Sequence, residues 1–371
     1  MRSFACLLLC AGLVACGPAP VTLHAPDELP ENLADWGIMR ANGRDLALHD
    51  DVRPYALNTP LFSDYALKLR TIWLPEGSAA AFRTHGPLDF PVGTIISKTF
   101  YYEKAPGFGP DRFAVLTTAR AELPEPGAGL DLERYVLVET RLLVRYDEGW
   151  KAIPYVWNRA QDSAQLAIAG DVLTIEHVTD SASDVFAYIV PDINQCSGCH
   201  VVNHSSKLLQ PIGPSAWQLN RQGMTDSAPQ NQLQAWAAAG LLTDLPEDIP
   251  EGVDWEDTTQ ALERRARAYL DSNCAHCHNA KGAADTSALD LSLAAVAGRQ
   301  YGICKPPVAV GRGSGDRPYD IYPGHPDKSI LLYRMQETAP EIAMPELGRS
   351  TVHTEALTLI GEWIASLDEL C

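Results

Sequence analysis

Two five-residue segments place two cysteines and a histidine at the same spacing: CSGCH at residues 196–200 and CAHCH at residues 274–278. Thiols three positions apart lie about one helical turn apart, so they can reach the two vinyl groups on one porphyrin edge. The histidine that follows can then swing under the iron as its proximal ligand. We therefore expect two covalently attached haem c groups, held by Cys196, Cys199, His200, Cys274, Cys277 and His278.

Cysteine pairs at this spacing also bind zinc or act as redox dithiols, and the two pairs here could share one zinc ion. A four-cysteine zinc site has no need of a histidine directly after the second cysteine, yet both copies have one. The haem interpretation uses every residue of both segments, so we favour it.

The distal ligand of the second iron is expected to be Met344. It lies in IAMPELG, an irregular proline-containing segment at residues 342–348, just before a C-terminal helical pattern. Met335 is the rival, but it belongs to an apolar helical run at residues 329–335 and is expected in the core. A histidine and a methionine fill both axial positions of an iron, and that favours electron transfer over chemistry on a substrate.

The distal ligand of the first iron is not indicated by any motif. His204 follows His200 by four residues, which on a continuing helix puts it on the same side of the porphyrin. Met224 is the single methionine between the two motifs and is our choice. His177 and the absence of a protein ligand stay open, and an open iron would permit peroxide chemistry.

The N-terminus has the layout of a secretory leader. Arg2 precedes an apolar run at residues 4–14 that is too short to span a bilayer. The run ends in LVACG at residues 13–17, which resembles the lipobox of bacterial lipoproteins, with Cys16 as the lipidated residue. Cys10 is a rival, but Leu9 is too large before a cleaved bond. We expect a periplasmic lipoprotein anchored to the outer membrane after loss of residues 1–15; an ordinary cleaved leader is the alternative.

Nine cysteines are then assigned without a remainder. Two leave with the leader, Cys16 takes lipid and four bind haem. Cys304 and Cys371 remain, and in an oxidising compartment a leftover pair usually forms a disulfide. We predict that bond; two free thiols are the alternative.

The chain has 371 residues and a formal net charge of −18. This negative charge argues against nucleic acid as a partner. It suits an exported protein, or one that docks to a basic redox partner. After the leader no run reaches the about 20 apolar residues of a membrane span, so membrane contact is expected through Cys16.

The expected fold is α+β and multidomain. A tether over residues 16–51 leads into a β-rich domain, sandwich or barrel, over 52–190, followed by the first haem-binding segment over 191–255 and a mainly α-helical cytochrome c domain over 256–371. Strands are predicted from β-branched and aromatic residues at 65–74, 94–102, 113–118, 135–146, 152–157 and 172–178. Helices are predicted at 230–239, at 257–272 leading into the second motif, and from a cap at Thr354.

With both motifs placed, the chain resembles an uncharacterised family of bacterial di-haem c-type cytochrome lipoproteins with a β-rich N-terminal region. The last part also resembles a class I cytochrome c domain. The family resemblance is carried by TPLFSDY at 59–65, YVWN at 155–158, QLNR at 218–221, and ICKPP at 303–307 with GRG at 311–313. It implies haem binding and electron transfer, often beside a parallel β-helix partner protein.

We therefore expect a non-catalytic carrier that passes electrons between redox partners in the cell envelope. One rival is a di-haem peroxidase, although those enzymes have more widely separated motifs and no large leading β domain. The other is a β domain that binds a ligand or partner while the haems sense redox state.

Overall fold

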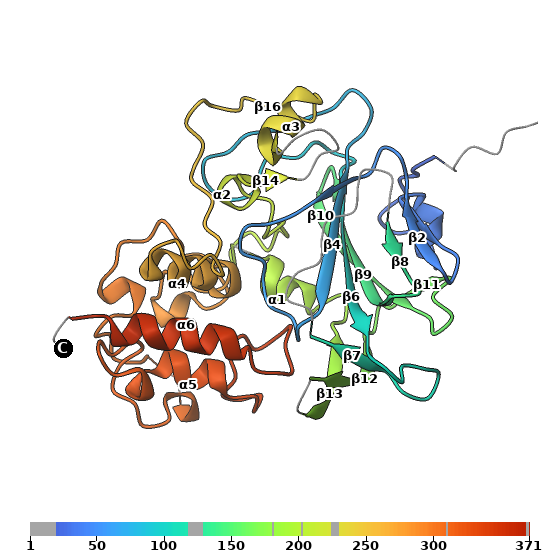
Figure 1. Ribbon diagram of the computed structural model, residues 1–371. Helices are drawn as coiled ribbons and strands as arrows, with labels where there is room; N and C mark the ends of the chain where they lie inside the picture. The colour runs from blue at the N-terminus through green and yellow to red at the C-terminus, as the bar shows by residue number, and fades with distance from the viewer. Residues whose placement is uncertain are drawn as a thin grey trace, which may run out of the picture.

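The computed structural model describes residues 20–117, 129–179, 182–201, 203–223, 230–308, 311–368 and 371. Cys16 and Met224 lie outside these residues. Figure 1 shows a curled sheet on one side of the molecule and the C-terminal helices on the other, with the short helix α1 (Cys196–His200) between them.

The main sheet is an open, curled half-barrel. Its strand order is β11-β10-β9-β6-β7-β12-β13, and β4 pairs with both β6 and β3. β6 is the central strand because it pairs with β9 on one side and with β4 and then β7 on the other. The strands are β3 (Arg53–Tyr55), β4 (Leu67–Trp73), β6 (Ile95–Lys104), β7 (Ala114–Leu116), β9 (Tyr135–Tyr146), β10 (Gly149–Trp157), β11 (Ala164–Leu166), β12 (Asp171–Val178) and β13 (Ser183–Val190).

The six predicted strands are all present, and five of them have shifted ends. The 135–146 strand matches β9 at both ends, because β-branched and apolar residues continue to the turn at Asp147 and Glu148. β13 was missed in the sequence, although it alternates between buried and exposed residues.

The expected tether over 16–51 is wrong in its described part. Residues 33–48 form the 3-10 helix η1 (Leu33–Trp36) and strands β1 (Met39–Ala41) and β2 (Asp45–Leu48), and β2 pairs with β8 (Leu130–Asp131). Trp36 is fully buried in the core on one face of the main sheet, where its indole donates to the Tyr155 hydroxyl at 2.8 Å. In the sequence, the polar neighbours of these few apolar residues obscured the hydrophobic pattern from which the elements could have been predicted.

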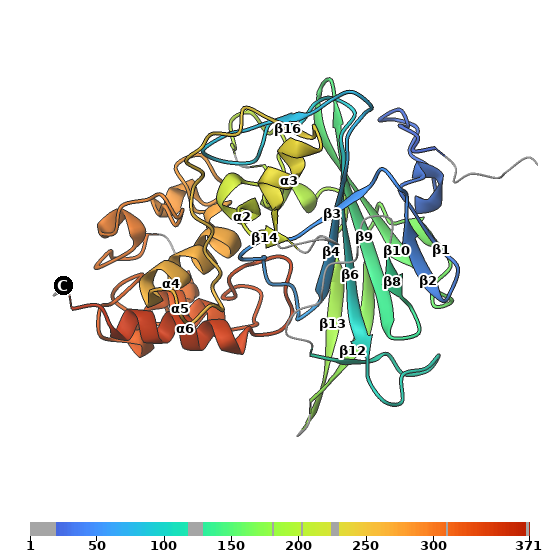
Figure 2. The same ribbon diagram turned by 45° about the horizontal axis from the view of Figure 1, so that its top comes forward.

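The segment after the sheet lies against its other face. Helices α2 (Ala216–Leu219) and α3 (Gln232–Ala238) place Leu219, Leu233 and Trp236 on apolar residues of β3, β4 and β6. Two small pairings complete this part, β14 (Gln222–Gly223) with β15 (Gln230–Asn231), and β16 (Leu242–Thr243) with β5 (Ala80–Ala81). Figure 2 shows these elements beside β3 and β4.

The C-terminal part packs α4 (Leu262–Leu270) against α6 (Thr354–Ala365), with α5 (Ile330–Gln336) beside them. Their shared core includes Tyr269, Leu270, Ile360 and Trp363. Thr354 is the first residue of α6 rather than its cap. Cys304 is joined to Cys371, S–S 1.99 Å, as predicted.

The expectation of a mainly α-helical cytochrome c region is wrong. The described structure is β-rich, with 27% strand and 20% helix, and its helices are few and short. The stretch between the second motif and α5 is rich in Gly, Pro and Asp, which favour turns, and it forms the 3-10 turns η3 (Asp285–Ser287), η4 (Arg299–Tyr301), η5 (Gly311–Ser314) and η6 (Pro326–Lys328). In the part of the chain that the structure describes, no helix has the length and apolar character to cross a bilayer.

Candidate haem-binding sites

The first motif forms α1, which lies between the sheet and the C-terminal helices (Figure 1). Nδ1 of His200 lies 2.8 Å from the carbonyl oxygen of Gln210. A carbonyl only accepts, so Nδ1 carries the proton and Nε2 is the nitrogen left for a metal. Burial, followed by the charge of Lys98, lowers the pKa of His200 to about 3. The imidazole is therefore neutral, as a metal ligand must be.

A cleft opens around the first motif, and its empty space, open mouth included, is about 1380 Å³. Cys196, Cys199 and His200 line one part of it. Strands β4, β6 and β9 form its floor, and residues 345–348 close another side.

The floor of the cleft carries a row of cations that the sequence analysis missed. The strand register sets Arg70 of β4 directly opposite Lys98 of β6, and Lys98 directly opposite Arg141 of β9. Lys68 also lines the cleft, two residues before Arg70 and therefore on the same face of β4. This period-two spacing of charges within an apolar strand was the signal that could have revealed them.

Like charges placed directly opposite each other destabilise a sheet, so the row needs negative charge nearby. Glu139 supplies one: its carboxylate, fully buried, accepts from Arg141 at 2.5 Å and from the Tyr188 hydroxyl at 2.7 Å. Burial and then the charges of Arg141 and Arg70 lower the pKa of Lys98 to about 7. Asp271 also lines the cleft. Four basic side chains against these two carboxylates leave a site that favours an anionic group.

The second motif continues directly from α4. The helix passes into a π-helical turn, η2 (Asp271–Ala275), that carries Cys274. Nδ1 of His278 lies 3.0 Å from Oγ of Ser287, which itself donates to the Ala284 carbonyl. The serine oxygen therefore accepts from Nδ1, and Nε2 of His278 is again the nitrogen left for a metal. Burial lowers the pKa of His278 to about 4, with smaller contributions from Arg334 and Lys305.

A pocket of about 400 Å³ lies beside Cys274 and is lined by both Met344 and Met335. Met335 is a buried residue of α5, as expected. Met344 lies in a non-helical segment whose backbone is held by hydrogen bonds: its N–H donates to Arg334 O at 3.0 Å, and its carbonyl accepts from Arg349. The structure thus brings Met344 to the second motif.

The two motifs, 78 residues apart in sequence, touch each other. Sγ of Cys277 lies 3.4 Å from the carbonyl oxygen of Gly198. Pro345 and Leu347 line both the cleft and the pocket.

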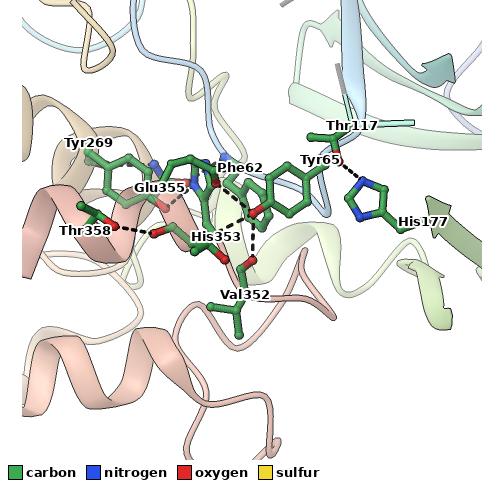
Figure 3. A network of polar contacts seen from close by, with 11 residues as sticks. Phe62, Tyr65, Thr117, His177, Tyr269, Val352, His353, Glu355 and Thr358 are labelled. Atoms are coloured by element: carbon green, nitrogen blue, oxygen red, sulfur yellow. Dashed lines mark hydrogen bonds and ion pairs between the residues drawn. The ribbon is translucent and has the colours of Figure 1, made fainter. Parts of the chain in front are cut away.

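Two histidines considered as distal ligands of the first iron do not line the cleft. Figure 3 shows His177 on the sheet side of an aromatic network, where it hydrogen-bonds Thr117 and stacks on Tyr65 with ring centroids 5.2 Å apart. The side chain of His204 is exposed. The same network reaches the pocket of the second motif through Phe62, which stacks on His353 at 4.0 Å.

The other uses of cysteine pairs fit this geometry poorly. Among the described residues no three His, Cys, Asp or Glu side chains are grouped so that they could hold a metal ion. The four motif thiols are free. Burial raises the pKa of Cys274 and of Cys277 to about 12 and also raises those of Cys196 and Cys199, the opposite of what an active redox dithiol requires.

The residues of TPLFSDY and QLNR join the two haem-motif regions to the sheet. The Gln218 side chain donates to Thr59 O and to Ser272 Oγ, both at 2.7 Å, and thereby connects α2 to the turn that carries Cys274. Oδ1 of Asp64 accepts from Ser350 N, Thr351 N and Thr351 Oγ1 at 2.7–2.8 Å. Their role is to position the motifs.

Comparisons with protein-family models, curated proteins and solved structures find no match for this chain.

Proposed function

We propose that this chain is an exported di-haem c-type cytochrome that transfers electrons between redox partners in the bacterial cell envelope. The observation that carries the proposal is shared by both motifs. Each has two free thiols followed by a half-buried histidine whose Nδ1 is hydrogen-bonded, which leaves Nε2 for iron. A haem c held at each motif supplies a one-electron Fe(II)/Fe(III) couple.

The residues present fit such a group. Four thiols would hold two porphyrins covalently, His200 and His278 would bind the irons, and Met344, which lines one pocket with Cys274, would be the second ligand at the second motif. The Gln210 carbonyl and the Ser287 hydroxyl fix the two imidazole tautomers and raise their basicity as ligands.

Through its row of cations, the sheet contributes positive charge to the first site. The carboxylates of haem are anionic, and Arg70, Lys98 and Arg141 offer the charges that would bind them. Such an anion would also raise the pKa of Lys98, which burial and then the neighbouring cations lower. The row is therefore better explained by a bound anion than by packing alone.

The contact between the motifs supports relay between two centres. Cys277 touches Gly198, and both sites share the wall formed by Pro345 and Leu347. Electron transfer between centres needs such closeness, whereas two independent binding sites do not.

The proposal also covers location and partners. Lipidation at Cys16 would attach the protein to the outer membrane from the periplasmic side, as the leader indicates. The partners are redox proteins, with a parallel β-helix protein as the candidate that the family resemblance implies.

A spectroscopic redox titration of the purified holoprotein, with added carbon monoxide and peroxide, tests the function. Two low-spin haems that react with neither would support a relay. A high-spin haem that binds carbon monoxide and turns over peroxide would favour the peroxidase instead. Absence of covalent haem after expression with the haem-maturation machinery would contradict both.

Replacing Met344 tests the second site. Met344→His should leave that haem low-spin but lower its potential on the order of 0.1 V, within the about 0.8 V range that axial ligands set. Met335→Leu, which keeps the core packing, is the matched control and should leave both potentials unchanged. The reverse result would assign the ligand to Met335.

A further inference from the structure

His276 is one of the two variable residues inside the second motif, yet it lines the cleft of the first motif. Cys199 and His200 line the same cleft as His276.

The imidazole of His276 is buried without a hydrogen-bond partner. The residue is 9% exposed, and its Nδ1 is fully buried with no acceptor or donor among the described residues. Buried polar nitrogens are almost always paired, and an exception needs an explanation such as a bound group. By contrast, the rings of His200 and His278 each have one nitrogen paired.

No other side chain in the described part of the cleft offers the first iron a better ligand. The cleft lining contains no methionine, and its two cysteines are those of the first motif. Besides His200 and His276, the nitrogen bases of the lining are the basic residues of the floor, of which Lys98 and Lys68 are the competitors because burial lowers the pKa of both.

We propose that His276 is the distal ligand of the first haem iron. This inference rests on the proposed function. The second motif then serves both irons, with His278 as ligand to the second and His276 as ligand to the first.

This assignment has two consequences for electron transfer. A bis-histidine iron has no open position, so the first haem is closed to peroxide. Methionine ligation raises the potential of a haem relative to histidine, so the second haem, with Met344, has the higher potential. This difference in ligands would favour electron transfer from the first haem to the second, while the basic residues at the first site would reduce the difference in potential.

The test compares His276→Ala with His204→Ala in the purified holoprotein. Covalent haem is counted by pyridine haemochrome absorbance, and spin state and carbon monoxide binding are followed by visible and EPR spectroscopy. His276→Ala should keep two covalent haems, turn one high-spin and bind one carbon monoxide per chain, with imidazole restoring the low-spin spectrum. His204→Ala removes an exposed histidine near the same motif and should change none of these properties.

A His276→Ala protein with two low-spin haems that ignore carbon monoxide would overturn the inference, and the same measurement on Lys98→Gln would show whether lysine is the ligand. If His276→Ala does not accumulate, His276→Met decides, because it keeps a ligand: one haem should gain a methionine–iron spectrum and a higher potential. Unchanged spectra and potentials would refute the assignment. A wild-type chain with fewer than two covalent haems would instead refute the proposed function, so the two failures differ.

Discussion

The two CxxCH segments have the same residue spacing but are positioned by different kinds of structure. The first is a five-residue helix, α1, held between the sheet and the C-terminal part. The second follows a nine-residue helix, α4, whose apolar face is packed on α6. The first motif is therefore positioned by its neighbours, and the second largely by its own helix.

The surroundings differ in charge as well. Four basic residues and the carboxylates of Glu139 and Asp271 lie at or below the first cleft, whereas the pocket of the second motif is lined by aromatic residues, two methionines and Arg349. The comparison teaches that the motif specifies covalent attachment, while the distal ligand and the charge environment come from distant strands and loops. The predictions below test whether the two sites are independent in this way.

The largest expected effect comes from removing one pair of thiols. Cys196→Ala with Cys199→Ala should leave one covalent haem instead of two, with the spectrum of a His/Met centre. Cys274→Ala with Cys277→Ala should also leave one, with a lower potential. Haem-stained gels and intact mass measure the count.

Loss of both haems in either double variant would refute the independence of the two sites. Each motif has its own thiols and proximal histidine, so attachment at one should not need the other. Loss of both would mean that the Cys277–Gly198 contact is required for the two regions to fold together.

The next effect concerns the sheet beneath the first site. Arg141→Gln leaves Glu139, which is 0% exposed, without its cation and should cost about 3 kcal/mol, the lower end for breaking a buried pair because Tyr188 still donates. Urea unfolding measures it. Arg264→Gln breaks an exposed pair with Glu251 and should cost at most about 1 kcal/mol. Equal costs would show that the cleft floor is not buried in the holoprotein.

The disulfide provides the matching test in the second region. Cys304→Ser with Cys371→Ser should lower stability by about 2–4 kcal/mol, since the bond closes a long loop. The unfolding midpoint with and without reductant should differ for the wild type and coincide for the variant. The spectrum of the first haem should not change, because neither cysteine lines its cleft.

The sequence predicted those features that depend on neighbours along the chain. Strand β9, the run from α4 into Cys274, and the pairing of Cys304 with Cys371 follow from residue pattern and cysteine count. These features can be predicted without knowing which residues are in contact across the fold, because sequence periodicity and the redox state of the compartment determine them.

What was missed depends on contacts across the fold. The cation row exists because β4, β6 and β9 lie side by side in one register, and register is a property of pairing. His276 occupies a variable position of a motif, and its role is visible only once the first cleft lies beside it. The two wrong expectations have opposite causes. In the tether, polar composition was given more weight than buried anchors such as Trp36, whereas in the C-terminal part the Gly, Pro and Asp before α5 were given too little weight.

The smallest expected effect concerns the hydrogen bonds by which Asp64 connects the sheet region to the C-terminal part. Its Oδ1 accepts three hydrogen bonds from residues 350 and 351, just after the Met344 segment, and its backbone is left-handed with φ 48°. Burial raises its pKa despite these bonds. A neutral acceptor therefore suits the site, so Asp64→Asn, which also tolerates this backbone, should be nearly neutral. Asp64→Ala leaves buried donors unpaired and should cost about 1–3 kcal/mol in urea unfolding.

The contact at Asp64 holds the segment that contains Met344. Asp64→Ala should therefore also broaden the redox transition of the second haem and leave that of the first unchanged. An effect on the first haem alone would show that this contact positions the first site instead.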